Sequence, residues 1–516
     1  MSDPDFSPRH SDAAVIDVGS NSVRLVLYRL DGRAVWTVYN EKVLAGLGRE
    51  LAATGRLAPE GVTNALVTLR RFRDLIDASR PRQVFATATA AVREAVDGAA
   101  FTARVFLETG LSLRILSGGE EARYAAHGVL AGAPSSMGLV GDLGGASLEL
   151  TPLEAGAPDR GRTLPLGPFS FPQTGRFEAD RVDEAVAKHA RALPTRFHSP
   201  VLNAVGGAWR NLALLQMRLS DYPLEIIHQY EIGRSDALAA ARFVRQQSRV
   251  SLERIEGISR RRVDALPHAA AVLEGLIEHL GIQRVVMSAY GLREGLVWEA
   301  MEPSLRRRDP LVDGCAALGS RHSVAEALGQ ALERWIGPAF ATLDPVFGAR
   351  DSLLLAAAAR LAELGAQLHP DHRAQLIFDQ VLRAPIAGMT HPERVYLACA
   401  AHARHTANGA LPEPATVTRL LSPERVQRAR ALGAALRLGC DLSGRSPELL
   451  RRASLEFRPT AVVLRADEGW GSTLLGEQTA KRATTLAGLL GRGLKMRERR
   501  GRVEPPPAGV ERIAAQ

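Results

Sequence analysis

Residues 14–28 read AVIDVGSNSVRLVLY and predict two short strands, 14–18 and 23–28, joined by a turn of Gly19, Ser20, Asn21 and Ser22. The flanking runs are rich in Val, Leu and Ile, which favour sheets. A turn of small and hydroxyl residues can direct several backbone N–H groups toward one anion. Asp17 ends the first run, where its carboxylate and a bound anion could share a divalent cation. The same residues also suit an ordinary hairpin, so this stretch alone leaves both interpretations open.

A second stretch repeats this arrangement. Residues 139–150, LVGDLGGASLEL, contain an apolar run, Asp142, the turn Gly144, Gly145, Ala146 and Ser147, and a second apolar run. Two matching hairpins indicate an internal duplication. Their turns could hold one phosphate chain from opposite sides.

The two hairpins resemble the phosphate loops of the acetate and sugar kinase, heat-shock chaperone and actin superfamily. Within it, five motifs are similar to those of the exopolyphosphatase and guanosine pentaphosphate phosphohydrolase family: DVGSNSVRL, ATATAAVREA, SGGEEAR, GDLGGASLEL and GLREG. The resemblance is close over residues 12 to about 305 and looser beyond them. It implies an α/β fold of duplicated actin-like (ribonuclease H-like) domains with a cleft between them, then an α-helical HD-like domain and a small α+β domain.

We therefore expect a polar segment over residues 1–12, actin-like domains over 13–134 and 135–305, a helical HD-like domain over 310–446, an α+β domain over 447–500 and a flexible tail over 501–516. Apolar periodicity predicts strands at 34–41, 83–88, 113–116, 201–205 and 282–288, and a long helix at 59–79. Residues 153–178 are rich in Pro and Gly and predict a connection that contains the turn 164–167, LPLG. A charged linker is expected at 304–309, and a single helix at about 473–490.

The residues that follow two of these strands are the candidates for catalysis. Arg93 leaves the carboxyl edge of the sheet, where α/β folds bind ligands, and the resemblance implies that it contacts a substrate phosphate. Ser117 and Glu120 have the spacing of a capping box, which gives Glu120 a structural role. Glu121 is not needed for that cap. The resemblance implies that the second glutamate of the pair activates water, so we predict that Glu121 is the general base.

The remaining candidates would bind phosphate and metal. The predicted phosphate-binding residues are Gly19, Ser20, Asn21, Ser22, Arg93, Gly144, Gly145, Ala146, Ser147 and Gly207. Asp142, with Asp17 and Glu149, is predicted to hold Mg²⁺, partly through water. Mn²⁺ is an alternative ion, and a monovalent cation such as K⁺ is a further candidate.

Three departures from the family pattern affect these assignments. Ala146 replaces a third glycine and Leu148 replaces a threonine, so the contacts of this turn rest on Gly144, Gly145 and Ser147. Ala208 also replaces a threonine. This leaves two roles open for the preceding pair, Gly206 and Gly207: N–H donation to a ligand, or close packing. The segment 291–295, GLREG, is expected to be architectural.

These residues predict hydrolysis of a terminal phosphate by water that Glu121 activates. No lysine follows either glycine turn, which disfavours a P-loop nucleotidase. The expected activity is a processive exopolyphosphatase. The alternatives are hydrolysis of guanosine pentaphosphate in the stringent response, transfer of phosphate from polyphosphate to a nucleoside diphosphate, and a non-catalytic polyphosphate- or nucleotide-binding regulator.

Composition constrains the partners. The 516 residues carry a net charge of +9. Almost all the positive charges are arginines, because lysine occurs only at positions 42, 188, 481 and 495. Arginine suits phosphate recognition, although coding bias explains the same composition. The three cysteines are isolated, and neither a signal peptide nor a long apolar run is found. We expect a cytoplasmic protein that binds polyphosphate, with guanosine penta- or tetraphosphate as an alternative ligand, and neither a membrane nor a specific nucleic acid. The family implies a homodimer.

The helical segment resembles a decayed HD phosphohydrolase. Its apolar lead-in ends at His402, but Ala403 stands where the metal-binding aspartate would be. His369, Asp371 and His372 lie on an earlier segment. Without the carboxylate, we predict that these histidines are loop or core residues and that the domain has no second active site.

Overall fold

The structure is a computed structural model that describes residues 12–154, 156–171, 177–255, 260–319, 323–407 and 409–499. The tail expected at 501–516 and all but Asp12 of the segment expected at 1–12 lie outside the described residues. The chain forms two compact units. Unit 1 is Met1–Gly314 with Pro385–His391, and unit 2 is Cys315–Ala384 with Pro392–Gln516.

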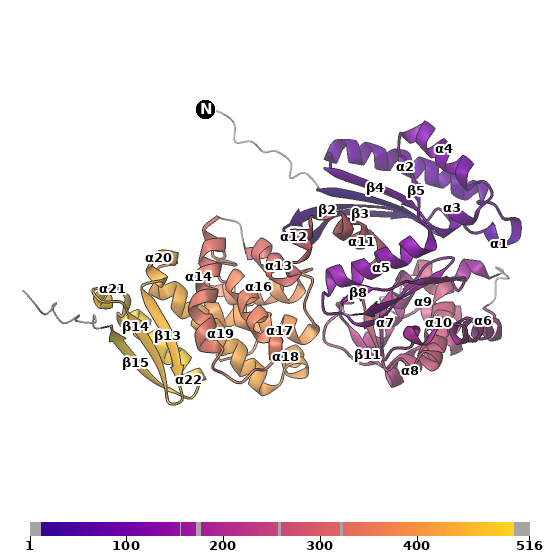
Figure 1. Cartoon of the computed structure of the whole chain (residues 1–516). Helices are drawn as coiled ribbons and strands as arrows, with labels where there is room; N and C mark the ends of the chain where they lie inside the picture. Colours follow the sequence, from indigo (N-terminus) through magenta and orange to yellow (C-terminus); the bar gives the residue numbers. More distant parts are fainter. Residues whose placement is uncertain are drawn as a thin grey trace, which may run out of the picture. The chain divides into compact units, whose positions relative to one another are not determined.

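The first part of unit 1, lobe I, is built on a mixed sheet (Figure 1). Its strands are β1 (Ala13–Val18), β2 (Val23–Asp31), β3 (Ala34–Val43), β4 (Gln83–Ala88) and β5 (Arg114–Ile115). They lie in the order β3-β2-β1-β4-β5, with β1 antiparallel to β2 and parallel to β4. The two apolar runs of the first hairpin therefore form the middle of this sheet.

The second part of unit 1, lobe II, repeats this topology. Its strands are β6 (Gly138–Leu143), β7 (Leu148–Glu154), β8 (Ala157–Pro158), β9 (Arg162–Leu164), β10 (Val201–Val205), β11 (Glu231–Gly233) and β12 (Arg284–Met287). β6 is antiparallel to β7 and parallel to β10, and β10 is parallel to β12. The order β7-β6-β10-β12 thus matches β2-β1-β4-β5 of lobe I, as the duplication predicted.

Helices cover both sheets. Those of unit 1 are α1 (Leu51–Thr54), α2 (Pro59–Ser79), α3 (Ala90–Glu94), α4 (Gly98–Thr109), α5 (Gly118–Gly132), α6 (Ala179–Arg191), α7 (Gly207–Leu219), α8 (Arg234–Gln246), α9 (Arg249–Glu253), α10 (Leu266–His279), α11 (Leu292–Ala300) and α12 (Pro303–Arg306), while α13 (Pro310–Gly319) runs from unit 1 into unit 2. α2 shows why such helices form here. It begins at Pro59, buries Leu69 and Phe72 on one face, and ends at Ser79, before Arg80, whose φ of 44° is left-handed.

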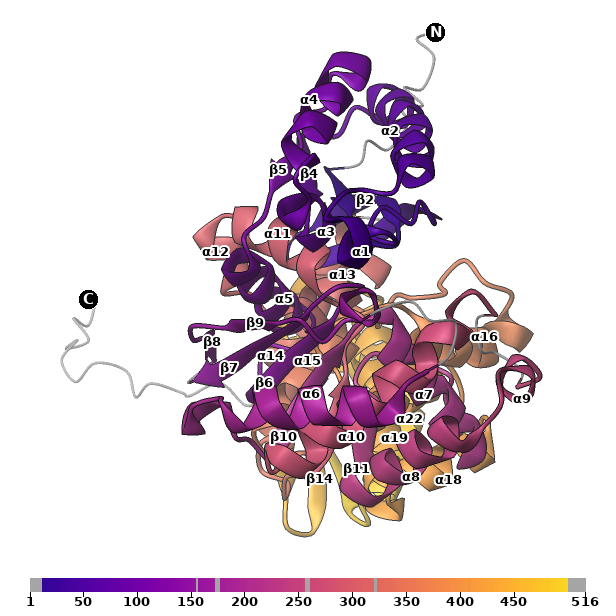
Figure 2. The ribbon, with the colours of Figure 1, turned by 90° about the vertical axis from the view of Figure 1, so that its right-hand side faces the viewer.

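One helix, α5, joins the two lobes. Tyr124 packs in the core beneath the lobe I sheet together with residues of α11. Val129 and Leu130 pack in a second cluster with Val140 and Val205 of the lobe II sheet. Figure 2 shows α5 between β4–β5 and β7–β9. The first turn of α5, which carries Glu121, is therefore held between the lobes.

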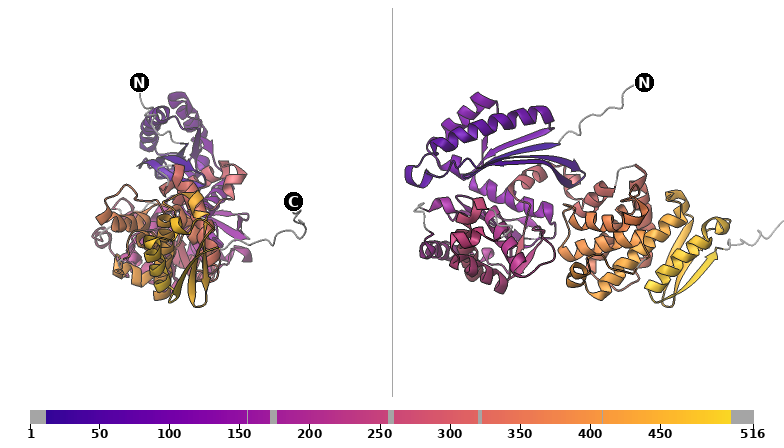
Figure 3. Two further views of the ribbon diagram at one scale, coloured as in Figure 1. Left: turned by 90° about the vertical axis from the view of Figure 1, so that its left-hand side faces the viewer. Right: turned by 180° about the vertical axis from the view of Figure 1, so that it is seen from behind.

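Unit 2 is helical and ends in a small sheet. Its helices are α14 (Ser323–Phe340), α15 (Asp351–Arg360), α16 (Pro370–Arg383), α17 (His391–His405, its first residue in unit 1), α18 (Pro414–Leu420), α19 (Pro423–Leu442), α20 (Pro447–Leu450), α21 (Gly471–Leu474) and α22 (Glu477–Leu489). β14 (Ala461–Ala466) lies between β13 (Ala453–Arg458) and β15 (Gly493–Glu498). α22 packs along this sheet, which is yellow in Figure 3.

The structure differs from the local predictions, or adds to them, at four places. Residues 153–178 contain β8 and β9, which pair with β7. The expected linker at 304–309 begins within α12. The single helix expected near 473–490 is two helices, α21 and α22, and β15 was not predicted. Among the described residues, no helix has the length and apolar character needed to cross a membrane.

Candidate active site

The two hairpin turns close in the same way. In lobe I the N–H of Gly19 donates to the carbonyl of Ser22 at 2.9 Å, and in lobe II the N–H of Gly144 donates to the carbonyl of Ser147 at 2.9 Å. In each turn, the next three backbone N–H groups donate to no backbone carbonyl within the described residues. Both turns therefore have the free donors that an anion site requires.

The two turns also approach one another. A methyl group added at Gly145 would lie 3.1 Å from the β-carbon of Ser20, which is itself buried. Two carbonyls of the lobe II turn already accept hydrogen bonds. The Phe169 N–H donates to the Gly145 carbonyl at 2.8 Å, and the Gly167 N–H donates to the Ala146 carbonyl at 3.1 Å. This leaves the N–H groups of the turn for a ligand.

Arg93 and Glu121 form an ion pair between α3 and α5. The Arg93 guanidinium also donates to the carbonyl of Leu116 at 2.8 Å, which fixes its position. Glu121 is only 6% exposed. Burial raises the pKa of Glu121 to about 7, although Arg93 lowers it, and Asp17 and Asp142 raise it further. A carboxyl group with this pKa can accept a proton near neutral pH.

The adjacent glutamate has the structural role that the spacing predicted. The Ser117 N–H donates to Glu120 at 2.9 Å, and the Glu120 N–H donates to the Ser117 hydroxyl at 3.3 Å. This capping box lowers the pKa of Glu120 to about 2, chiefly through the backbone N–H of Ser117. The predicted capping box is confirmed.

Two further carboxylates lie close to Glu121. Glu149 is 5% exposed, and its Oε1 has no hydrogen-bond partner. Burial, and then the charge of Glu121, raise the pKa of Glu149 well above its usual value, while the Ser147 hydroxyl lowers it. Burial raises the pKa of Asp142 to about 6, against the effect of Arg293. Several carboxylates in one buried region repel each other, and a bound cation would relieve that repulsion.

Asp17, the third predicted metal ligand, is paired with an arginine instead. Arg293, the second residue of α11, donates to the Asp17 carboxylate at 3.0 Å. Burial and the charge of Arg293 lower the pKa of Arg24 to about 10, so a second guanidinium lies nearby. In the described parts of the chain, no three His, Cys, Asp or Glu side chains are gathered in the manner of a complete metal site. Any cation here would need water or substrate oxygens as further ligands.

Arg293 is the residue that the sequence interpretation missed. It was grouped with an architectural segment, although it follows strand β12 as Arg93 follows β4. The carboxyl-edge argument applied to Arg93 would have identified it. Glu294 beside it does have an architectural role, because it accepts from the Tyr28 hydroxyl at 2.5 Å and from the Gly291 N–H at 2.9 Å.

The sequence allows two roles for Gly206 and Gly207, N–H donation to a ligand and close packing. Gly206 has a φ of 120°, and a β-carbon there would lie 2.6 Å from the carbonyl oxygen of Leu143. Only glycine can occupy such a position, so Gly206 serves close packing. Gly207 begins α7.

Among the described residues, the histidines of the helical region form no group of three side chains that could hold a metal, although the His369 and His372 rings lie 5.8 Å apart. His369 is exposed and caps α16 by accepting from the Asp371 N–H at 3.3 Å. His402 lies on α17, where burial and then the charge of Arg430 lower its pKa. The absence of a second active site stays a prediction.

Residues 26–303 match the Ppx/GppA phosphatase family, and residues 313–496 match the family described as "Exopolyphosphatase, C-terminal". A relative named Exopolyphosphatase 1, from Mycobacterium tuberculosis and Mycobacterium bovis, is 26% identical over 331 residues, which is 61% of this chain and 94% of the relative. A solved exopolyphosphatase structure from Cytophaga hutchinsonii has a TM-score of 0.50 at 22% identity and covers 55% of this chain and 96% of that one. A Ppx/GppA family member from Aquifex aeolicus has a TM-score of 0.48 at 23% identity, with coverage of 55% and 95%. The expected fold class, duplicated actin-like α/β domains followed by a helical region, is confirmed.

Proposed function

The chain belongs to the Ppx/GppA phosphatase family and is a phosphoric anhydride hydrolase, and from this premise we propose that it is an Mg²⁺-dependent exopolyphosphatase. One observation carries the proposal: two matching turns with free N–H groups meet near buried Glu121, whose pKa is raised by burial and also by Asp17 and Asp142, the carboxylates that precede the two turns. Such an arrangement can hold a terminal phosphate against a general base. The net charge of +9 favours a long polyanion over a neutral substrate.

In the proposed reaction, the turn N–H groups and Arg93 hold the terminal phosphate. Glu121 accepts a proton from a water molecule, whose oxygen attacks the terminal phosphorus. The bond to the bridging oxygen breaks, and the shortened chain leaves with that oxygen. A leaving polyphosphate oxygen is weakly basic, so no side-chain acid is required.

The substrate would also alter the ion pair between Arg93 and Glu121. A bound phosphate competes for the Arg93 guanidinium, because phosphate accepts bidentate hydrogen bonds from arginine. When the substrate phosphate binds the Arg93 guanidinium, the Glu121 carboxylate would become available to bind water. Arg293, which donates to Asp17 at 3.0 Å, is a further candidate to neutralise the negative charge of the substrate phosphate.

The residues fit a divalent cation. The unpaired Oε1 of buried Glu149 and the carboxylate of Asp142 are hard oxygen donors that Mg²⁺ prefers. When bound, the cation would neutralise phosphate charge in the transition state. Asp17 is a weaker candidate than expected, because Arg293 already holds it. Mn²⁺ and K⁺ stay secondary candidates.

The test is phosphate release from long-chain polyphosphate, guanosine pentaphosphate and ATP, measured side by side with Mg²⁺. We expect long-chain polyphosphate to give the highest kcat/KM. If digestion is processive, uncut full-length chains and free phosphate should be present together during the reaction. A higher kcat/KM for guanosine pentaphosphate would replace our proposal with that activity. ATP formation from ADP and polyphosphate would indicate a phosphotransferase.

Two other expectations are also proposals. We propose a homodimer, which sedimentation of the purified chain tests, and a cytoplasmic location, which cell fractionation tests. Neither is needed for the proposed reaction.

A further inference from the structure

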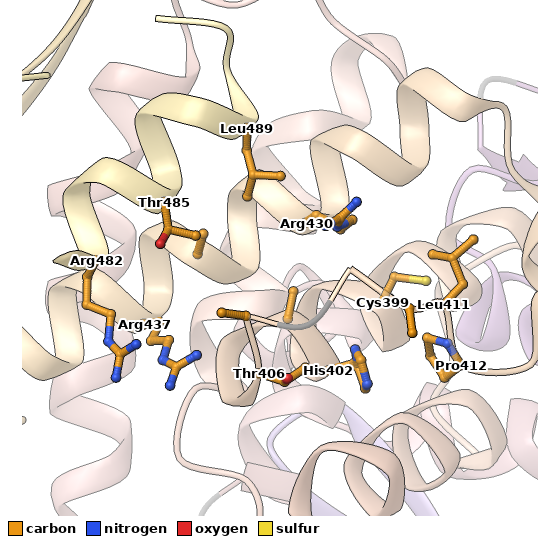
Figure 4. Close-up of a pocket in the computed structure, with 14 residues that line it drawn as sticks. Cys399, His402, Thr406, Leu411, Pro412, Arg430, Arg437, Arg482, Thr485 and Leu489 are labelled. Carbon is orange, nitrogen blue, oxygen red and sulfur yellow. The ribbon is translucent and has the colours of Figure 1, made fainter. Parts of the chain in front are cut away.

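The pocket shown in Figure 4 lies in unit 2, between α17, α19 and α22, with Arg437 and Arg482 at one end and Leu411 and Pro412 at the other. Its volume is about 50 Å³, well below the roughly 300–1,000 Å³ of small-molecule sites. It has room for a few water molecules and not for an organic ligand. The contacts behind the lobe II turn, in unit 1, support an inference of their own.

The lobe II turn is held by residues 164–170, which we call the support segment. The Gly167 N–H donates to the Ala146 carbonyl at 3.1 Å, and the Phe169 N–H donates to the Gly145 carbonyl at 2.8 Å. A methyl group added at Gly167 would lie 2.4 Å from the carbonyl carbon of Ala146, so the two backbones are in direct contact. The position of the turn is therefore set by the position of the support segment.

The lobe I turn is held in the same way. The Gly48 N–H donates to the Ser20 carbonyl at 2.8 Å, and the Gly46 N–H donates to the Asn21 carbonyl at 3.1 Å. The carbonyls that accept are those of the second and third residues of the turn, as in lobe II. The duplication thus includes the support of the turns as well as the turns themselves.

A histidine attaches the support segment of lobe II to helix α10. His268 Nε2 lies 2.8 Å from the carbonyl oxygen of Leu166. Because a carbonyl can only accept, Nε2 carries the proton and donates it. His268 is 5% exposed, and its ring packs edge-on against that of Phe171, with the two centroids 5.0 Å apart. Burial lowers the pKa of His268, although the bond to Leu166 opposes this effect, so the ring is neutral near neutral pH.

Helix α10 is a firm point of attachment. Ala269 and Val272 of this helix are fully buried in the core of lobe II, and the Ala269 carbonyl accepts from the Trp209 indole of α7 at 2.9 Å. In lobe I the corresponding attachment is made by backbone alone, because the Ala58 N–H donates to the Leu47 carbonyl at 3.0 Å. In lobe II it depends on a side chain, which substitution can remove.

We propose that His268 is a positioning residue for the terminal phosphate of the substrate. It would act through Leu166 and Gly167 on the N–H groups of the lobe II turn, without touching the substrate itself. The inference rests on the proposed function of that turn as a phosphate site. Loss of the His268 donor would leave the Leu166 carbonyl without this partner and the support segment less firmly held.

The experiment compares His268→Phe with His268→Gln. The first keeps an aromatic ring beside Phe171 but has no donor, and the second keeps an N–H donor at a similar reach. In His268→Phe we expect the KM for polyphosphate to rise about tenfold and kcat to change less than about threefold, because the lost contact binds substrate and transition state alike. In His268→Gln the KM should stay within about threefold of the unchanged chain. If His268→Phe does not fold, the smaller His268→Leu takes its place.

Asn203→Leu is the matched control. Asn203 is buried in the same lobe and donates to the Met137 and Leu139 carbonyls at 2.9 and 3.3 Å, near the start of β6, whereas the turn follows the end of β6. This variant should lose stability in thermal denaturation, as His268→Phe does, but keep its KM within about twofold. An equal rise of KM in Asn203→Leu and His268→Phe would overturn the proposal.

Hydrogen exchange of the full chain without substrate tests the attachment independently of any activity. In His268→Phe, the Gly167 and Phe169 amides should exchange at least about tenfold faster, while those of Gly46 and Gly48 keep their rates. If polyphosphate is not hydrolysed, the proposed function fails, the KM comparison moves to whichever of guanosine pentaphosphate and ATP is hydrolysed, and the exchange rates still decide the role of His268. Unchanged exchange in His268→Phe, or an unchanged KM, would overturn that role.

Discussion

Adjacent residues of α5 have opposite environments. Glu120 is partly exposed and is held by the Ser117 cap, whereas Glu121 is buried against Arg93. The pKa of Glu120 is lowered to about 2 and that of Glu121 is raised to about 7. Only Glu121 can exchange a proton near neutral pH, so the difference in environment separates a structural from a catalytic carboxylate.

Substitution of each glutamate tests this separation. Glu121→Gln should lower kcat by about 10²–10⁴ because the general base is lost. Glu120→Gln should leave kcat close to that of the unchanged chain and lower the free energy of unfolding by about 0.5–2 kcal/mol. Phosphate release and chemical denaturation measure the two effects. A larger loss of kcat in Glu120→Gln than in Glu121→Gln would reverse the assignment.

The pH dependence of the rate should reflect Glu121. The base works only when ionised, so kcat/KM should rise with pH through the Glu121 pKa of about 7. Arg93→Gln removes a charge that lowers this pKa, so the rising limb should move to higher pH by about one to three units. Arg114→Gln, which removes the partner of Glu120 and a contact with Tyr124 but no contact with Glu121, is the matched control and should leave the limb in place. A limb that stays in place in Arg93→Gln would contradict the role of Glu121.

Asp142 should determine the need for metal. Asp142→Asn should raise the Mg²⁺ concentration for half-maximal activity by at least about tenfold, because a charged oxygen ligand becomes neutral. The measurement is a Mg²⁺ titration of the rate at saturating polyphosphate. Asp159→Asn, which loses only an exposed ion pair with Arg196, should behave like the unchanged chain. Full activity of the unchanged chain in excess chelator would exclude the metal role.

At the scale of elements, the two hairpin turns must approach closely. Gly145→Ala places a methyl group 3.1 Å from both Ser20 and Phe169, so the turns must separate by a few tenths of an ångström or more. We expect kcat/KM for polyphosphate to fall by about ten- to hundredfold. Gly119→Ala adds a methyl group to open space on α5 and is the control. Equal kcat/KM in both variants would show that the approach of the turns is not required.

Strong periodicity made some elements predictable to the residue. The bounds expected for α2, β4 and β10 are those observed. α2 has a long apolar pattern that begins at Pro59, and β10 is an apolar run between Pro200 and Gly206. β8, β9 and β15 were not predicted, because two are very short and β15 has little apolar alternation. The hairpins indicated where a ligand site could form. The pairing of Asp17 with Arg293 joins residues 276 positions apart, and local pattern carries no information about it.

At the scale of the whole molecule, unit 1 is completed by a short segment that lies much later in the sequence. Residues 385–391 return from the helical region to complete unit 1. Gly388 N–H donates to the Gly132 carbonyl at 2.7 Å. His391 is buried and bonds to the Tyr222 hydroxyl at 2.8 Å and the His228 carbonyl at 3.1 Å. The sequence gives no sign of this return, because the segment is short and no motif marks it.

His391→Ala should therefore destabilise unit 1 from a distant point in the sequence. Two hydrogen bonds are lost and buried polar partners are left unsatisfied, so we expect a loss of about 2–4 kcal/mol in the free energy of unfolding. Chemical denaturation of the full chain measures it. His372→Ala, at an exposed site, should cost less than about 0.5 kcal/mol. Equal stability of the two variants would contradict this role of the segment.

The return of residues 385–391 also has a consequence for synthesis on the ribosome. N-terminal domains usually fold first, as soon as they emerge from the exit tunnel, at a synthesis rate of about 5–20 residues per second. Here the N-terminal unit lacks its last packing segment until His391 has been translated, several seconds after Gly314. During that interval the surfaces around Gly132 and His228 are uncovered in the nascent chain. Chaperones that bind nascent polypeptides have this interval in which to act.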